Sequence, residues 1–242
     1  MRAIILAAGA STRLASVAKG KPKGLLAVGP KAILEHQVDR LRQCGVTDLV
    51  VVVGNCAEEV KACLGDAPAY ILNPLYAATN NIYSLWCARE EIGGRETVCM
   101  HGDVLFHVET LAKLLSRREE VCLVVDLKPD EETMRVRIDG DRIVGVNKKI
   151  AYAEASGTFI GIAKFSAGGG ERFVRELERL VMAGQTGGYF TDAIEAMIDK
   201  GERVAFSTTD GLPWADIDSP EDLRRVRDEI YPLLVGPGGS LL

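Results

Sequence analysis

The 242-residue chain lacks the sequence features of membrane, secreted and nucleic-acid-binding proteins, and each absence reduces the range of functions that it can have. It has no apolar run as long as a membrane span, and the stretch from Ala3 to Ala8 is too short for the core of a signal peptide. We therefore expect a cytoplasmic protein with no membrane partner. The net charge of −5 gives no global basic field, so we expect no nucleic-acid partner. Any anionic substrate must be held by local positive groups.

Cysteine and histidine are not arranged as a metal or disulfide framework. The six cysteines form no CxxC pair and stand in apolar or helical stretches, which favours reduced and buried side chains. The three histidines, His36, His101 and His107, share no ligand spacing, which argues against zinc.

The first half of the chain alternates between predicted strands and helices. This order predicts right-handed crossovers and a doubly wound sheet. Ligands of such sheets lie beyond the carboxyl ends of the strands, which places the Gly9 loop, the segment 73–81 and Asp103 on one rim. Strands are expected at 2–9, 48–54, 69–74 and 97–103, and helices at 32–45, 57–65, 80–92 and 108–119.

The second half is richer in predicted strands. Residues 120–128, 134–140 and 142–149 read as strands in hairpins, followed by a strand at 157–166, helices at 170–184 and 190–201, and a strand at 203–210. Ser219 is a suitable N-cap for a last helix at 219–234, and Pro220 suits its first position. No linker separates domains, so we expect one domain over 1–235 and a disordered tail over 236–242.

The loop after the first predicted strand has the composition of an anion site. Gly9 allows close backbone approach, and the small residues around it leave amide groups uncovered. Arg13 can form a fork onto a phosphate, and Lys23 supplies a point charge. Lys21 is a weaker candidate, since a solvated loop lysine explains it equally. The loop matches neither GxxxxGK[ST] nor GxGxxG.

The string LAAGASTRL, followed by KPKGLL, resembles the signature of the nucleotidyltransferase (pyrophosphorylase) superfamily, LAAGxGxRL and then KPK, with Ser11 in place of the second glycine. The resemblance implies that a nucleoside triphosphate is coupled to a phosphorylated small molecule, and that Arg13 and Lys23 neutralise the triphosphate as pyrophosphate leaves. It also implies an α/β, three-layer Rossmann-like (GT-A-like) fold with a mixed, mainly parallel central sheet and a small β-rich acceptor-binding part.

A magnesium site is expected, because a divalent cation relieves the repulsion between two polyanions and Mg²⁺ prefers oxygen ligands. A lone aspartate at a strand end is more often a helix cap or a turn residue, but Asp103 in MHGDVLF matches the superfamily's "GD" metal position, which favours a metal ligand. Asp216 and Asp218 alternate with Ile217 and so point to one side of an extended segment. This segment resembles the family's late metal-binding acid; Asp218 is the main candidate, since Ser219 already fills the role of helix cap.

The string NPLYAATNNIYSLWCA resembles the cytidylyltransferases that activate phosphocholine, 2-aminoethylphosphonate or inositol phosphate with CTP. Asn80 and Asn81 could read the cytosine edge or the acceptor, or could cap a helix. The nucleotide-binding residues expected on this basis and from the first motif are Leu6, Ala8, Gly9, Ala10, Asn80, Asn81, Ser84 and Gly102.

The acceptor is expected near Lys149, Thr158, Tyr189 and Asp192. Lys149 falls where the superfamily often places a lysine against the acceptor's phosphate, and Lys148 is an equal alternative. Asp192 could hold an ammonium group or cap its own helix. Thr158 stands where sugar-specific relatives commonly have glutamate, which disfavours a hexose and leaves the acceptor open.

The resemblance therefore implies a magnesium-dependent cytidylyltransferase that acts on CTP and a small phosphorylated or phosphonate acceptor. No general base is required, because the attacking phosphate is already ionised at neutral pH. Two alternatives remain: a sugar-1-phosphate nucleotidylyltransferase, and a catalytically inactive nucleotide-binding regulator, which would not need the two metal carboxylates. A homodimer is common among such enzymes, but no residue pattern here marks an interface.

Overall fold

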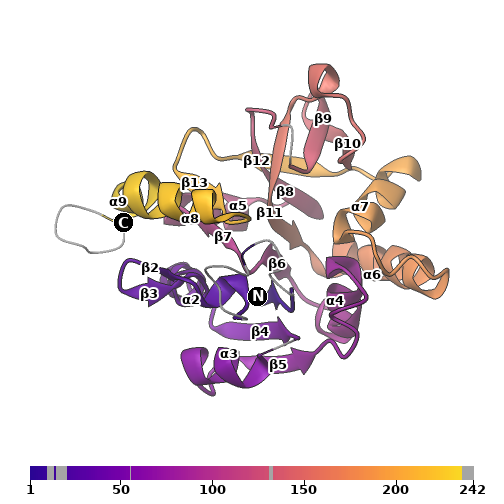
Figure 1. Cartoon of the computed structure of the whole chain (residues 1–242). Helices are drawn as coiled ribbons and strands as arrows, with labels where there is room; N and C mark the ends of the chain where they lie inside the picture. Colours follow the sequence, from indigo (N-terminus) through magenta and orange to yellow (C-terminus); the bar gives the residue numbers. More distant parts are fainter. Residues whose placement is uncertain (10–13, 15–20, 55, 131–132, 236–242) are drawn as a thin grey trace.

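Figure 1 shows the computed structural model of the chain, which describes residues 1–9, 14, 21–54, 56–130 and 133–235. A nine-stranded sheet runs through these residues in the order β10-β9-β11-β6-β1-β4-β5, with β8 beside β11 and β12 beside β8. Its strands are β1 (Arg2–Ala7), β4 (Asp48–Val53), β5 (Ala69–Leu72), β6 (Thr97–His101), β8 (Val121–Asp126), β9 (Arg135–Asp139), β10 (Arg142–Asn147), β11 (Gly157–Phe165) and β12 (Ala205–Thr208).

Most strands of this sheet run in one direction. β1 is parallel to β4 and β6, β4 is parallel to β5, and β12 is parallel to β8. β11 is antiparallel to its neighbours β6, β8 and β9, and β10 is antiparallel to β9. The sheet is therefore mixed and mainly parallel, as the sequence predicts.

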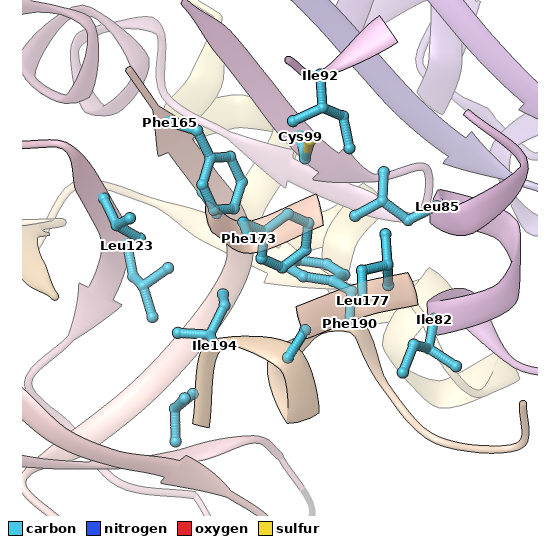
Figure 2. Packing of buried hydrophobic residues seen from close by; sticks show 14 of the residues in the cluster. Ile82, Leu85, Ile92, Cys99, Leu123, Phe165, Phe173, Leu177, Phe190 and Ile194 are labelled. Atoms are coloured by element: carbon cyan, nitrogen blue, oxygen red, sulfur yellow. The ribbon is translucent and has the colours of Figure 1, made fainter. Parts of the chain in front are cut away.

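Helices cover both faces of the sheet because the strands carry apolar residues on both sides. In β1, Ile4 and Leu6 belong to one buried cluster, and Ala3 and Ile5 belong to another. The first cluster takes in α4 (Asn81–Cys87), α6 (Ala167–Met182) and α7 (Phe190–Asp199), and Figure 2 shows their side chains packed together. The second takes in α2 (Ile33–Gln43), α3 (Ala57–Leu64) and α5 (Val108–Ser116), so the fold has three layers.

A third apolar cluster attaches the end of the chain to its beginning. It joins Leu26 and Ile33 to Ile217, Leu223 and other buried side chains of the last helical segments. The elements involved are the hairpin β2 (Ala27–Val28) and β3 (Lys31–Ala32), the antiparallel pair β7 (Val104–Phe106) and β13 (Trp214–Asp216), and the helical run α8 (Pro220–Arg225), η5 (Val226–Ile230) and α9 (Tyr231–Leu234). Figure 1 shows this yellow helical run beside β13.

Several local predictions are confirmed. Ser219 caps α8, its Oγ accepting the Asp222 N–H at 3.1 Å, and Pro220 is the first helical residue. β9 and β10 form the expected hairpin, with Gly140 in the left-handed region of backbone conformation. As a structural finding separate from these predictions, no helix among the described residues combines the length and apolarity needed to cross a bilayer.

Other local predictions are wrong. β8 does not form a hairpin with β9, because β11 lies between them and its Thr158 stands opposite Asp126 of β8 and Arg135 of β9. The physical reason is that the side chains of β8 are apolar and buried on both faces. Such a strand is stable in the interior of the sheet, between β11 and β12 and between the two helical layers. The helix expected at 80–92 ends at Cys87 and continues as a 3₁₀ turn at Arg89–Glu91. The helix expected at 219–234 is interrupted by the π-helical segment η5.

Candidate active site

A cleft of about 1060 Å³ opens where β1 and β6 end, on the rim that sheet topology predicts for a ligand. Residues that are far apart in sequence meet there, from the loop after β1, the turn after β6, the start of α4 and the segment around β13. Its volume lies just above the usual range of small-molecule sites, about 300–1000 Å³, so the cleft can take more than one small group.

Most of the residues expected in the site from sequence do line this cleft. They are Leu6, Ala8, Gly9, Lys23, Asn80, Asn81, Ser84, Gly102, Asp103, Tyr189, Asp216 and Asp218. Lys149, Thr158 and Asp192 are not among the lining residues. Ala10, Arg13 and the neighbouring Ser11 lie outside the described residues.

Three carboxylates and one ammonium group converge at one end of the cleft. Asp103, Asp216 and Asp218 each offer an oxygen, and these oxygens lie within 4.8 Å of one another. Lys23 Nζ lies 3.2 Å from Asp103 Oδ2 and also pairs with Asp218. The four residues come from the turn after β6, the strand β13, the segment before α8 and the 3₁₀ turn η2 (Lys23–Leu25).

Like charges in this cluster are close enough to shift its ionisation. Burial, and then the charges of Asp103 and Asp218, raise the pKa of Asp216 well above its ordinary value. For Lys23, burial alone would lower the pKa, but the charges of Asp103 and Asp218 outweigh burial and raise it. Asp216 Oδ1 is buried and has no hydrogen-bond partner among the described residues. An oxygen-only set with excess negative charge and an unsatisfied carboxylate oxygen fits a hard divalent cation.

Two glycines allow the segments of this cluster to touch. A Cβ atom at Gly24 would lie 2.8 Å from the Gly102 carbonyl oxygen, and one at Gly102 would lie 2.8 Å from the Leu6 carbonyl oxygen. The turn that carries Lys23 therefore packs directly against the turn that carries Asp103, and that turn packs against the end of β1. Gly24 was not singled out from sequence, although it follows Lys23 directly in the KPKG string.

The asparagine pair ties three elements together beside the cleft. Asn80 caps α4, its Oδ1 accepting the Asn81 N–H at 2.8 Å. Asn81 Oδ1 accepts the Phe190 N–H at 2.8 Å, and its Nδ2 lies 3.2 Å from His101 Nε2. Burial lowers the pKa of His101 and so favours the neutral ring, whose Nε2 can accept this bond. Ser84 Oγ accepts a hydrogen bond from Asn73 Nδ2 at 3.0 Å.

On the opposite wall, the structure separates the two candidate lysines. Lys148 lines the cleft, with its Nζ 5.0 Å from the centre of the Tyr189 ring. Lys149 donates its backbone N–H to Asn147 Oδ1 at 2.9 Å and does not line the cleft, although both lysines are exposed. Asp192 caps α7 by accepting the Tyr189 N–H at 2.9 Å, and burial raises its pKa. Of the two roles left open for Asp192, the structure therefore shows the cap.

Thr158 supports the cleft wall from inside the protein. It is 1 % exposed, and its Oγ1 accepts the Asp130 N–H at 3.1 Å and lies 3.0 Å from Thr133 Oγ1. Sequence analysis missed Asp126, which lines the cleft and accepts a 2.5 Å hydrogen bond from Trp214 Nε1. The signal was present, since Asp126 ends β8, which runs in the same direction as β6 and so reaches the same rim.

The fold and the site together define a class: an α/β protein that can hold a phosphorylated ligand and a divalent cation at the carboxyl ends of parallel strands. Residues 3–180 match the family described as the MobA-like NTP transferase domain, and the chain belongs to that family. The protein is accordingly a nucleotidyltransferase, and the resemblance stated from sequence is confirmed.

Its relatives include several enzymes that are named for cytidylyl chemistry. The chain is 26% identical over 252 residues to CTP:phosphoglutamine cytidylyltransferase of Campylobacter jejuni, covering 92% of this chain and 98% of the relative. It is 29% identical over 252 residues to CMP-5'-(3-aminopropyl)phosphonate synthase of Streptomyces rubellomurinus, covering 96% of this chain but 39% of that longer protein. A solved structure of CTP:phosphocholine cytidylyltransferase from Streptococcus pneumoniae superposes with a TM-score of 0.75 at 25% identity, covering 94% of this chain and 97% of that one.

Proposed function

We propose that this nucleotidyltransferase is a magnesium-dependent cytidylyltransferase that transfers CMP from CTP to a small phosphorylated or phosphonate acceptor and releases pyrophosphate. The observation that carries the proposal is the convergence of Lys23 with Asp103, Asp216 and Asp218 at one end of a cleft large enough for a nucleotide and an acceptor. The named activities of the three relatives described above support CTP as the nucleotide.

The reaction joins two anions, so the protein's main tasks are positioning and neutralisation of charge. An oxygen of the acceptor phosphate or phosphonate attacks the α-phosphorus of CTP. The bond from that phosphorus to the oxygen bridging to the β-phosphorus breaks, and pyrophosphate takes the electron pair. The attacking oxygen is already ionised, so no side chain has to accept a proton from it.

Each charged residue of the cluster then has a proposed role. Asp103, Asp216 and Asp218 would hold Mg²⁺, which supplies neutralisation of the phosphate charge. Lys23, and Arg13 in the segment outside the described residues, would bind the triphosphate oxygens. Lys23 pairs with Asp103 and Asp218, so binding of a triphosphate by Lys23 would require the release of part of these contacts.

The nucleotide is proposed to lie along the ends of β1 and β6. Gly9 and its neighbours Leu6, Ala8 and Ala10 would meet it through the backbone, as would Gly102. The Asn80 Oδ1 is used in the helix cap, so its Nδ2 is the group proposed to meet the base. Ser84 and Asn81 would act mainly by holding this wall.

The acceptor is proposed to lie against the wall formed by Lys148 and Tyr189, which face the cleft. A lysine beside an aromatic ring suits an acceptor with an anionic group and an apolar or cationic remainder. Thr158, which is buried, and Asp192, which is half-buried, would support this wall through their hydrogen bonds rather than touch the acceptor.

The test is a matrix of pyrophosphate-release assays. Each of the four nucleoside triphosphates is combined with phosphocholine, 2-aminoethylphosphonate, inositol phosphate, a phosphorylated amide and glucose 1-phosphate, with and without Mg²⁺. The proposal predicts turnover that requires CTP, Mg²⁺ and one of the non-sugar acceptors. Turnover of TTP with glucose 1-phosphate and none with CTP would contradict it in favour of a sugar-1-phosphate enzyme. Nucleotide binding without turnover of any pair would favour a regulator.

A further inference from the structure

Gln37 of α2 is a buried polar residue whose side chain reaches the turn that carries Asp103. Its Nε2 lies 2.7 Å from the carbonyl oxygen of His101 and 2.8 Å from that of Val104. His101 ends β6 and Val104 begins β7, so one amide group joins both sides of the turn formed by Gly102 and Asp103. Gln37 is 0% exposed, and a buried polar side chain is favourable only when its hydrogen bonds are made.

The chemistry of these two bonds demands a primary amide. Both partners are carbonyl oxygens, which only accept, so the NH₂ end of Gln37 must face the turn. Glutamine and asparagine are the neutral side chains that offer two N–H donors on one atom, and asparagine is one methylene shorter. Gln37 Oε1 has no hydrogen-bond partner within the described part of the chain, so holding the turn is the polar contribution that the structure shows for this residue.

The same turn is tied to the other two acids on its far side. The Asp103 carbonyl oxygen accepts the N–H of Ile217 at 3.2 Å, and Ile217 stands between Asp216 and Asp218. Val104 is opposite Asp216 in the pairing of β7 with β13. Gln37 therefore holds the turn at Gly102 and Asp103 in place from the helical layer. The segment that carries Asp216 and Asp218 is in turn bonded to this turn.

The three carboxylates of the cluster are held close together in spite of their mutual electrostatic repulsion. Lys23 offsets only part of the repulsion among three carboxylates within 4.8 Å, so the turn is favoured to relax outward into water, whereas a cation bound by all three requires them to stay close. Residues that orient metal ligands without touching the metal typically change metal affinity or activity by about 10–100-fold when they are removed.

We propose that Gln37 is a positioning residue, which holds the Asp103 turn so that the three carboxylates bind a divalent cation together. The inference rests on the proposed metal-dependent function. It adds a residue of α2 that does not line the cleft and so touches neither nucleotide nor acceptor. If Gln37 has this role, the affinity of the site for a divalent cation depends on the Gln37 side chain, although that side chain carries no charge.

The test compares wild type with Gln37→Met and Gln37→Glu, which keep the length of the side chain and remove the NH₂ group. Binding of Mn²⁺ alone is measured by electron paramagnetic resonance, without nucleotide or acceptor. Thermal unfolding is recorded in EDTA, and the Mg²⁺ dependence of pyrophosphate release is measured with saturating CTP. Val38→Ala is the matched control, because Val38 is a neighbouring buried residue of α2 that packs in the apolar cluster.

Both Gln37 variants are expected to weaken Mn²⁺ binding by about tenfold or more and to shift the Mg²⁺ activation curve in the same direction. The KM for CTP at saturating Mg²⁺ should stay near wild type. Val38→Ala should lower the unfolding temperature and leave Mn²⁺ affinity unchanged. If folded Gln37 variants bind Mn²⁺ as tightly as wild type, the inference about Gln37 is wrong, while the proposed function stands. The inference is also wrong if both Gln37 variants fail to fold while the Val38→Ala control folds. Absence of Mn²⁺ binding by wild type would overturn the proposed metal site itself, and the inference with it.

Discussion

Replacing Asp103 with asparagine separates the catalytic from the structural contribution of the acid cluster. The change removes one negative charge and keeps the shape. The new amide oxygen can still accept a hydrogen bond from Lys23, and Asp218 still pairs with this lysine, so only the charge attraction of one pair is lost. The two side chains are 17% and 24% exposed, which puts the expected loss at the upper end of the range for exposed pairs, about 1 kcal/mol. The substitution also removes a like charge that raises the pKa of Asp216, which acts in the opposite direction. The net change in unfolding free energy should therefore be within about 1 kcal/mol, or roughly 2–4 °C for a chain of this size.

The effect of Asp103→Asn on turnover should be far larger. Charge stabilisation by a bound metal contributes several kcal/mol to the barrier. A loss of about 4 kcal/mol, at 1.36 kcal/mol for each tenfold change, corresponds to a fall of about 10³-fold in kcat. The assay is coupled pyrophosphate release at saturating Mg²⁺, with unfolding temperature measured on the same preparations. Near wild-type turnover would refute the metal assignment, and an unfolding temperature lowered by more than about 10 °C would refute the view that Asp103 serves chemistry more than folding.

Three further changes probe the same cleft. Lys23→Met should lower kcat about 10²-fold or more. It should also tighten Mn²⁺ binding, because the ammonium group no longer competes for Asp218. Mn²⁺ binding is measured by electron paramagnetic resonance, and weaker binding would contradict this prediction. Burial and like charge raise the pKa of Asp216 in the folded state, so the metal-free fold loses stability as the pH rises from the unfolded-state pKa to the raised one. The stabilisation gained in Asp216→Asn, measured in EDTA, should therefore shrink as the pH falls from about 8 to about 5 toward the unfolded-state pKa. A pH-independent gain in unfolding temperature would contradict the raised pKa. Gly24→Ala places a Cβ 2.8 Å from the Gly102 carbonyl oxygen. It should lower the unfolding free energy, measured by denaturant titration, by about 1–3 kcal/mol, and should also lower kcat. No change in either quantity would mean that the two turns are not in contact.

The sequence is most informative where local pattern and sheet topology coincide. The apolar strands ending at Gly9 and Asp103 predict the rim of the cleft, because parallel strands end together. The alternation of Asp216 with Asp218 predicts that both acids face one side, and the structure brings them within 4.8 Å of Asp103. These features are short-range or follow from strand direction, so they can be predicted without coordinates.

Features that depend on long-range packing could not be predicted in this way. Gln37 contacts a carbonyl group 64 residues away, and no local pattern distinguishes it from an ordinary polar residue of a helix. The choice between Lys148 and Lys149 depends on which side chain faces Tyr189 after the turn that follows β10. Thr158 lies inside the wall because β11 is inserted between β8 and β9, a pairing that the strand sequences alone do not specify.

The most direct test of the central claim is a crystal structure of the protein with Mg²⁺ and a non-hydrolysable CTP analogue. The account predicts that the triphosphate lies between the loop at Gly9 and Lys23, with a metal ion joining its oxygens to Asp103 and Asp218. A triphosphate bound elsewhere, or a metal ion held without either carboxylate, would contradict it.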